Sequence, residues 1–243
     1  MNVPPKIRAF ASAEALAEAA GIHFVDAVPP RAPFHVALSG GRIAKAFYDS
    51  IVSRAAAESR NVDNIHFFFA DERCVPPSDP ESNFLTARQS LFEPLQIRDE
   101  QIHRIHGETE DTYAVREAEA ELCRIAPLNP DGQPILDLAI LGMGEDGHTA
   151  SLFPGESPTL IHDKSVYRAV TAVKPPPRRV TLGYAPLRAA RQLIVLASGK
   201  AKEGILRQVL SEVKSGAPTL PLSRVLSDHP NVIIFTDVPN ISA

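Results

Sequence analysis

The segment LGMGEDGHTASLFPG, near the middle of the chain, contains an acidic residue and a histidine two positions apart, Asp146 and His148. Glycines around them, among them Gly144 and Gly147, allow the backbone to turn tightly. A neutral imidazole can accept a proton from water at neutral pH, and a positioned general base typically contributes about 10²–10⁴ in rate. A loop histidine is more often an ordinary surface residue. The flanking acid and the glycines nevertheless favour a catalytic loop, in which Asp146 orients the ring or stabilises the imidazolium.

Two glycine-containing loops are suited to binding a phosphate group. In VALSGGRIAKAF, Ser39, Gly40 and Gly41 lie between an apolar segment and a helix candidate, so backbone N–H groups can approach an anion at the helix N-terminus. A tight turn without a ligand explains the same residues equally well. In LASGKAK, Lys200 stands at the start of another helix candidate, where its ammonium and the helix dipole can act together on a phosphate. A lone lysine is, however, more often on the surface.

Charged and polar residues follow a third apolar segment, in FFFADERCVPPSDPESNF. Asp71, Glu72 and Arg73 come directly after this segment, and a proline-rich stretch then leads to Asn83. Three successive charges most often form a solvated turn. In open α/β sheets, however, ligands bind at the carboxyl ends of the strands. These residues are therefore candidates for a binding pocket, and Arg178 and Arg179, which follow three prolines, can supply a further cation.

Motifs that bind cofactors or metals are absent or poorly placed. GMGEDG matches the dinucleotide-binding pattern GxGxxG, but that pattern opens a long helix in the first βαβ unit. Here Pro154 follows closely, and Glu145 and Asp146 would repel a pyrophosphate. The sequence has no GxSxG nucleophile elbow, no HExxH motif and no cysteine–histidine cluster. We therefore expect neither a cofactor nor a metal ion.

The composition favours a cytoplasmic enzyme that acts on a small molecule. Apolar residues make up 44% and charged residues 22% of the 243 residues, as in ordinary globular proteins. The net charge of -4 lacks the basic excess that nucleic acids and anionic membranes attract. The two cysteines form no CxxC pair, and no stretch reaches the ~20 apolar residues that cross a bilayer. We expect one domain over residues 1–243, as a monomer or small homo-oligomer.

Short apolar segments alternate with amphipathic ones along the chain. This pattern predicts a doubly wound α/β fold, a mostly parallel sheet with helices on both faces, in three layers as in Rossmann-like folds. Segments such as ILDLAILG and QLIVLA are apolar throughout, as expected of strands buried on both faces. The predicted strands are 34–38, 65–70, 102–105, 136–141, 166–172, 179–183, 192–197 and 232–235. The predicted helices are 12–28, 43–57, 111–126 and 201–214.

In their order and spacing, SGG, ADER, SNF, GMGEDGHTASLFPG, PPPRRVTLG and SGKAK make the chain resemble the 6-phosphogluconolactonase branch of the glucosamine-6-phosphate isomerase/6-phosphogluconolactonase superfamily. The histidine segment is highly specific, whereas SGG and SGKAK are weak by themselves. The resemblance spans nearly the whole chain. It implies a doubly wound α/β fold and hydrolysis of 6-phospho-D-glucono-1,5-lactone to 6-phosphogluconate in the oxidative pentose phosphate pathway, without a required cofactor.

The resemblance also implies a role for each matching residue. His148 is expected to activate the attacking water, with Asp146 as its supporting carboxylate. Backbone N–H groups near Gly144 or Gly147 are candidates for stabilising the oxyanion. The residues expected to hold the phosphate are Ser39, Gly40, Gly41, Arg73, Arg179 and Lys200, and those expected to line the rest of the pocket are Asp71, Glu72 and Asn83.

Two residues depart from related patterns. The family commonly has serine or threonine after the two glycines, where this chain has Arg42, which either adds a phosphate contact or points outward. In the deaminase pattern of the superfamily, a glutamate stands five residues after the histidine. The corresponding Phe153 cannot carry protons, so lactone hydrolysis is favoured over deamination. A third alternative, a sugar-phosphate sensor of a transcriptional regulator, lacks a helix-turn-helix or basic region to bind DNA.

Overall fold

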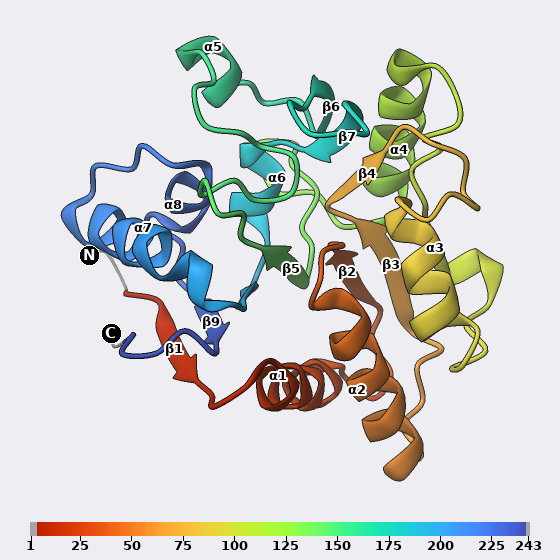
Figure 1. Cartoon of the computed structure of the whole chain (residues 1–243). Helices are drawn as coiled ribbons and strands as arrows, with labels where there is room; N and C mark the ends of the chain where they lie inside the picture. Colours follow the sequence, from red (N-terminus) through yellow and green to blue (C-terminus); the bar gives the residue numbers. More distant parts are fainter. Residues whose placement is uncertain (1–3, 242–243) are drawn as a thin grey trace.

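A six-stranded sheet forms the centre of the molecule in the computed structural model, which describes residues 4–241 (Figure 1). Its strands lie in the order β1 (Lys6–Ala9), β9 (Val232–Thr236), β8 (Leu193–Ala197), β5 (Leu138–Gly142), β2 (Phe34–Leu38) and β3 (Ile65–Phe69). All neighbouring strands are parallel. Every residue of β2, β8 and β9 is buried, as expected of apolar strands that are covered on both faces. The predicted α/β fold is confirmed.

Helices cover both faces of this sheet. α1 (Ala13–Ala27) and α2 (Ala44–Ala57) pack against each other on one face, and α7 (Glu203–Ser215) and α8 (Pro221–Leu226) lie on the other (Figure 1). The helices lie on two faces because parallel strands are joined by right-handed crossovers. The chain crosses the sheet in one direction from β2 to β3 and in the opposite direction from β8 to β9, so the connecting helices lie on opposite faces. Within residues 4–241, no helix is both long and apolar enough to span a membrane.

The four predicted helices are confirmed to within a few residues. They correspond to α1, α2, α4 (Asp111–Ile125) and α7. The prediction 201–214 also covers part of a 3-10 turn before α7, η3 (Lys200–Lys202). α7 ends at Gly216, whose φ of 70° is the left-handed conformation that glycine favours at a helix C-terminus. The shorter helices are α3 (Asn83–Ala87), the π-helical turn η1 (Arg88–Phe92), η2 (Asp99–Gln101), α5 (Pro158–Ile161) and α6 (Tyr184–Ala189).

A second, antiparallel sheet contains β4 (Asp71–Arg73), β7 (Arg178–Leu182) and β6 (Tyr167–Thr171). The strands predicted at 166–172 and 179–183 are present as β6 and β7, and they belong to this second sheet rather than to the parallel one. β7 is the middle strand and pairs with β6 on one side and with β4 on the other. β4 is a strand of three charged residues that its composition did not reveal. Because β4 follows β3 almost directly, the second sheet lies next to the carboxyl end of the first.

The strand predicted at 102–105 is wrong. Only Ile102 forms a bridge, to Phe67 of β3, and the N–H of His103 donates to the Phe67 carbonyl. The His103 imidazole then bonds to Glu121 of α4 and to His66 of β3, so the segment leaves the sheet after one bridge. Strand β1, in contrast, was not predicted because KIRA has no apolar run; it pairs with β9 at the edge of the sheet.

Candidate active site

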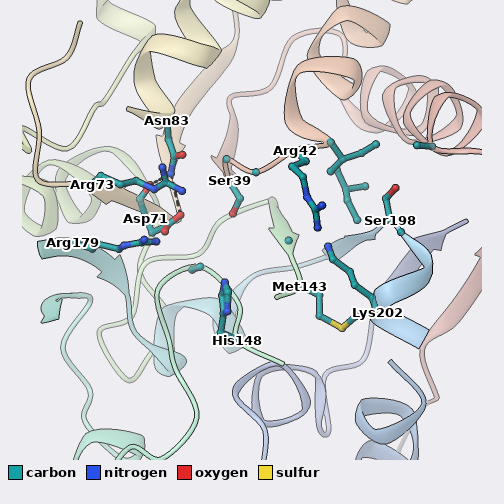
Figure 2. A pocket seen from close by; sticks show the side chains of 18 residues that line it. Ser39, Arg42, Asp71, Arg73, Asn83, Met143, His148, Arg179, Ser198 and Lys202 are labelled. Carbon is teal, nitrogen blue, oxygen red and sulfur yellow. Dashed lines mark hydrogen bonds between the residues drawn. The ribbon is translucent and has the colours of Figure 1, made fainter. Parts of the chain in front are cut away.

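A pocket of about 300 Å³ opens at the carboxyl ends of β2, β5 and β8, the edge at which doubly wound sheets bind ligands. In Figure 2, His148 and Ser39 lie in its middle, Arg179 and Asp71 on one side, and Lys202 on the other. The predicted site residues that the structure brings together here are Ser39, Gly40, Gly41, Arg42, Asp71, Arg73, Asn83, His148 and Arg179.

His148 is held by Asp146, which does not itself line the pocket. The imidazole Nδ1 lies 2.5 Å from Asp146 Oδ1, and the His148 backbone N–H donates to the same oxygen at 3.2 Å. Burial raises the pKa of Asp146, but these hydrogen bonds and the charge of His148 bring it below its ordinary value. Because an ionised carboxylate only accepts, Nδ1 carries a ring proton, so the neutral form of the imidazole has its lone pair on Nε2. The ring, directed into the pocket in Figure 2, is therefore in the tautomer that a general base needs.

The glycines of this loop make room for the side chains of Asp146 and His148. A Cβ on Gly144 would lie 2.1 Å from His148 Nδ1 and 2.6 Å from Asp146 Oδ1. Gly147 has a φ of 80°, which side chains disfavour. The Gly144 N–H donates to the His148 carbonyl at 2.9 Å, and the Gly147 N–H donates to the Gly144 carbonyl at 3.1 Å. Both N–H groups expected to stabilise an oxyanion are thus bonded within the turn, and neither glycine lines the pocket.

The loop after β2 presents Ser39, Gly40 and Gly41 to the pocket. Ser39 is 7% exposed, and its hydroxyl has no hydrogen-bond partner within the described part of the chain. A Cβ on Gly40 would lie 1.9 Å from Asn83 Oδ1, so only glycine allows this approach. Gly41 has a φ of 105°, and the chain then enters the 14-residue helix α2. Backbone N–H groups before a helix of this length are well placed to hold an anion.

Asp71 is buried, and each of its carboxylate oxygens accepts from an uncharged donor. The Ser151 hydroxyl donates to Oδ2 at 2.7 Å, and the Asn83 amide donates to Oδ1 at 3.2 Å. The same amide donates to the Asp71 carbonyl at 2.9 Å. Ser151 was not singled out from the sequence, where only its place in the histidine segment pointed to it. Its hydrogen bond ties the histidine loop to β4.

Glu72 does not line the pocket. It is 3% exposed and accepts from the backbone N–H groups of Arg73, Asn83 and Phe84 at 2.7 to 2.8 Å, and from the Ser82 hydroxyl at 3.0 Å. Burial raises the pKa of Glu72, and these hydrogen bonds oppose the rise. The carboxylate therefore fixes the start of α3, and with it the position of Asn83.

Arg73 and Arg179 are cross-strand partners and both line the pocket. Arg73 Nη1 donates to the Glu81 carbonyl at 2.6 Å and to its carboxylate at 3.2 Å. Arg179 is 8% exposed; its Nε donates to the Pro176 carbonyl at 3.1 Å and its Nη2 to the Lys174 carbonyl at 3.3 Å. Burial lowers the pKa of Arg179, and the charge of Arg73 lowers it further.

The lysine that lines the pocket is Lys202, whereas Lys200 is exposed outside it. The segment SGKAK contains both lysines, and the path of the backbone through the turn η3 decides which of the two side chains faces the pocket. Burial lowers the pKa of Lys202. Asp237, which the sequence did not point to, holds this loop by accepting from the Ser198 hydroxyl at 2.8 Å and the Gly199 N–H at 2.7 Å.

Arg42 lines the pocket, and its side chain points toward Lys202 (Figure 2). Its Nη2 lies 3.2 Å from Glu145 Oε1, and the two side chains are 83% and 54% exposed. Such an exposed ion pair is weak, so the guanidinium can exchange Glu145 for an anionic ligand. Within residues 4–241, no three histidine, cysteine, aspartate or glutamate side chains gather in a way that could hold a metal ion.

The chain is similar to known proteins over most of its length. A family model described as glucosamine-6-phosphate isomerases/6-phosphogluconolactonase matches residues 8–234. A 6-phosphogluconolactonase of Haemophilus influenzae is 36% identical over 188 residues, which are 76% of this chain and 77% of that protein. The solved 6-phosphogluconolactonase of Trypanosoma brucei is 27% identical, with a TM-score of 0.83 over 96% of this chain and 95% of that chain. A solved monomeric glucosamine-6-phosphate deaminase, 21% identical with a TM-score of 0.80 over 95% of this chain and 96% of that chain, shares the fold. The chain therefore belongs to the glucosamine-6-phosphate isomerase/6-phosphogluconolactonase family.

Proposed function

We propose that this chain is a 6-phosphogluconolactonase, which hydrolyses 6-phospho-D-glucono-1,5-lactone to 6-phosphogluconate in the oxidative pentose phosphate pathway. The observation that carries the proposal is the setting of His148. Asp146 holds its Nδ1, and the ring faces a pocket with Lys202 on one side and Arg179 on the other. Relatives named 6-phosphogluconolactonase that are 36% identical to the chain support the choice of substrate.

The phosphate of the substrate fits the side of the pocket formed by the loops after β2 and β8. Backbone N–H groups of Gly40 and Gly41 precede the N-terminus of α2, whose dipole attracts an anion. The Ser39 hydroxyl is without a partner, and the Lys202 ammonium forms no ion pair, within residues 4–241. Both keep free donors for phosphate oxygens. Lys202 takes the role expected of Lys200, and Arg42 adds a second positive charge.

When the phosphate binds there, the C1 carbonyl of the substrate lies near His148. As Nε2 takes a proton from water, the water oxygen bonds to C1 and the carbonyl oxygen becomes an oxyanion. The bond between C1 and the ring oxygen then breaks, and the imidazolium returns its proton to the ring oxygen. The new carboxylic acid loses its proton to solvent, and His148 is neutral again. Asp146 stabilises the imidazolium between the two transfers.

Phe153 argues against deamination in the same pocket. Ring opening and isomerisation of an amino sugar need an acid–base group at this position, and a phenyl ring supplies none. The Phe153 ring instead contacts the His148 imidazole, with 5.2 Å between the ring centroids. At this position the chain therefore offers an apolar contact to His148 and no second acid–base group.

Purified protein tests the proposal directly. It should accelerate loss of the phosphorylated lactone above spontaneous hydrolysis and release no ammonia from glucosamine 6-phosphate. His148→Ala should lower kcat by about 10²–10⁴ with little change in KM, because the general base acts in the transition state. A protein that releases ammonia and leaves the lactone at its spontaneous rate would overturn the assignment.

We also propose that the chain is one domain that works in the cytoplasm, as a monomer or small homo-oligomer that binds no nucleic acid. One hydrophobic cluster extends from Leu16 to Ile241, and both cysteines are free thiols. The net charge of -4 does not favour a polyanionic partner. Light scattering and a thermal unfolding curve test the proposal. A large assembly, or two separate unfolding transitions, would contradict it.

A further inference from the structure

Arg179 carries a buried positive charge without an anionic partner. The residue is 8% exposed, and no carboxylate forms an ion pair with it within residues 4–241. Its two hydrogen-bond partners are the uncharged carbonyl oxygens of Pro176 and Lys174. A buried charge is costly unless an opposite charge compensates it. An anionic group of a ligand is therefore the partner that this side chain lacks.

The nearby carboxylates do not fill this role. The charges of Asp71 and Glu81 raise the pKa of Arg179, but neither carboxylate forms an ion pair with it in the described part of the chain. The oxygens of Asp71 accept from Ser151 and Asn83, and Glu81 pairs with Arg73. Of the five N–H donors of a guanidinium, one on Nε and one on Nη2 are bound. Both donors on Nη1 have no acceptor in the described part of the chain, and Figure 2 shows the group directed into the pocket.

The substrate of the proposed reaction brings one anion, and hydrolysis creates a second. The phosphate fits the loops near Lys202. The carbonyl oxygen at C1 becomes an oxyanion during attack, and C1 ends as a carboxylate. Arg179 and Lys202 lie on opposite sides of the pocket in Figure 2, with His148 between them in this view. A ligand whose phosphate binds at Lys202 therefore extends C1 toward His148 and Arg179.

Arg179 and His148 both lie beside the ring of Phe153. The Arg179 guanidinium carbon lies 5.9 Å from the centroid of the Phe153 ring, and the His148 imidazole lies 5.2 Å from it, centroid to centroid. The backbone N–H groups of Gly144 and Gly147 are bonded within their turn, so they do not supply the oxyanion donors. Arg179 is the buried cation that can take their place.

We propose that Arg179 binds the C1 oxygens of the ligand, first the oxyanion of the tetrahedral intermediate and then the carboxylate of the product. This inference rests on the proposed lactone hydrolysis and takes Arg179 out of the phosphate site. When the water oxygen bonds to C1, the carbonyl electron pair moves onto the oxygen that Arg179 holds. The pair returns as the bond to the ring oxygen breaks, and His148 protonates the ring oxygen. A planar guanidinium suits both states, because parallel N–H groups match the two oxygens of a carboxylate.

Two ligands that differ only at C1 test the proposal by calorimetry. 6-Phosphogluconate has a carboxylate there, and glucitol 6-phosphate has an alcohol. Arg179→Met should raise the Kd of the carboxylate ligand by about 10- to 100-fold, the loss expected for hydrogen bonds to a charged group, and that of the alcohol by less than about threefold. Lys202→Met should weaken both ligands equally. Arg178→Met is the matched control, because this neighbouring arginine is exposed, pairs with Asp111 at 2.8 Å and lies outside the pocket.

Kinetics provide a second readout. Arg179→Met should lower kcat at least about 10-fold with a smaller change in KM, and Arg179→Lys, which keeps the charge and loses the planar fork, should fall between it and the wild type. Equal weakening of both ligands by Arg179→Met would mean a phosphate contact and would overturn the proposal. If the Arg179→Met variant does not fold, the Kd values of the same two ligands are measured with Arg179→Lys instead. A wild-type protein that binds both ligands and leaves the lactone intact would instead refute the proposed function.

Discussion

Replacing Gly144 with alanine tests whether the position of the His148 ring controls the reaction. The new Cβ would lie 2.1 Å from His148 Nδ1, where ordinary van der Waals contact begins at 3.4 Å. The imidazole must therefore move by about 1 Å, and the 2.5 Å hydrogen bond to Asp146 breaks. The φ of Gly144 lies outside the left-handed region, so alanine adds no backbone strain and the fold should survive. A displacement of this size lowers rates by about 100-fold, or about 2.7 kcal/mol in the barrier.

Steady-state hydrolysis of the lactone, corrected for its spontaneous loss, measures this effect, and thermal unfolding checks the fold. Gly204→Ala is the matched control, because a Cβ there meets no atom within 4 Å and the residue lies within α7. Alanine in a helix is favoured over glycine by about 0.5–1 kcal/mol, so the control should keep its kcat and melt slightly higher. A Gly144→Ala enzyme with a kcat within about threefold of the wild type would refute the reasoning.

Three further predictions concern the pocket and the fold. Lys202→Ala should raise KM by about 10-fold or more and Lys200→Ala should leave it unchanged, as measured by initial rates; equal effects would contradict the choice of Lys202. Gly40→Ala places a Cβ 1.9 Å from Asn83 Oδ1, so it should displace this amide from Asp71 and destabilise the protein by about 1–3 kcal/mol in urea unfolding; an unchanged midpoint would contradict the clash. Burial raises the pKa of Glu212, but hydrogen bonds from the Leu220 N–H, Ser223 and Thr219 outweigh this effect and lower the pKa from 4.5 to about 2. The ionised carboxylate therefore stabilises the fold at pH values above the unfolded-state pKa, and this stabilisation is lost as the pH falls through the folded-state pKa. After screening at this partly exposed side chain, Glu212→Gln should cost about 1–2 kcal/mol at pH 7, and a loss of the same size near pH 2 would show that the ionised form is not what matters.

The parallel sheet and the long helices could be predicted because their signals are local. β2, β8 and β9 are apolar throughout, and α7 buries Leu206, Val209 and Val213 at helical spacing. β4 could not be found in this way, since three charged residues resemble a solvated turn. It forms a strand only because β7 supplies its partner more than a hundred residues later. The strand prediction for segment 102–105 was wrong for the opposite reason. Its apolar residues suggest a strand, but the segment forms only one bridge to β3.

The sequence by itself determined the pairing of Asp146 with His148, the proposed catalytic pair, because the two are two residues apart in one turn and the glycines that make room for them lie in the same segment. The tertiary structure decided which of the other candidates line the pocket. Successive side chains of a strand point to opposite faces, so Asp71 and Arg73 line the pocket while Glu72 fixes α3. The same alternation and the register between β4 and β7 direct Arg179 inward, and the turn η3 selects Lys202 over Lys200. These choices depend on pairing between distant segments, which residue types and spacing along the chain do not specify.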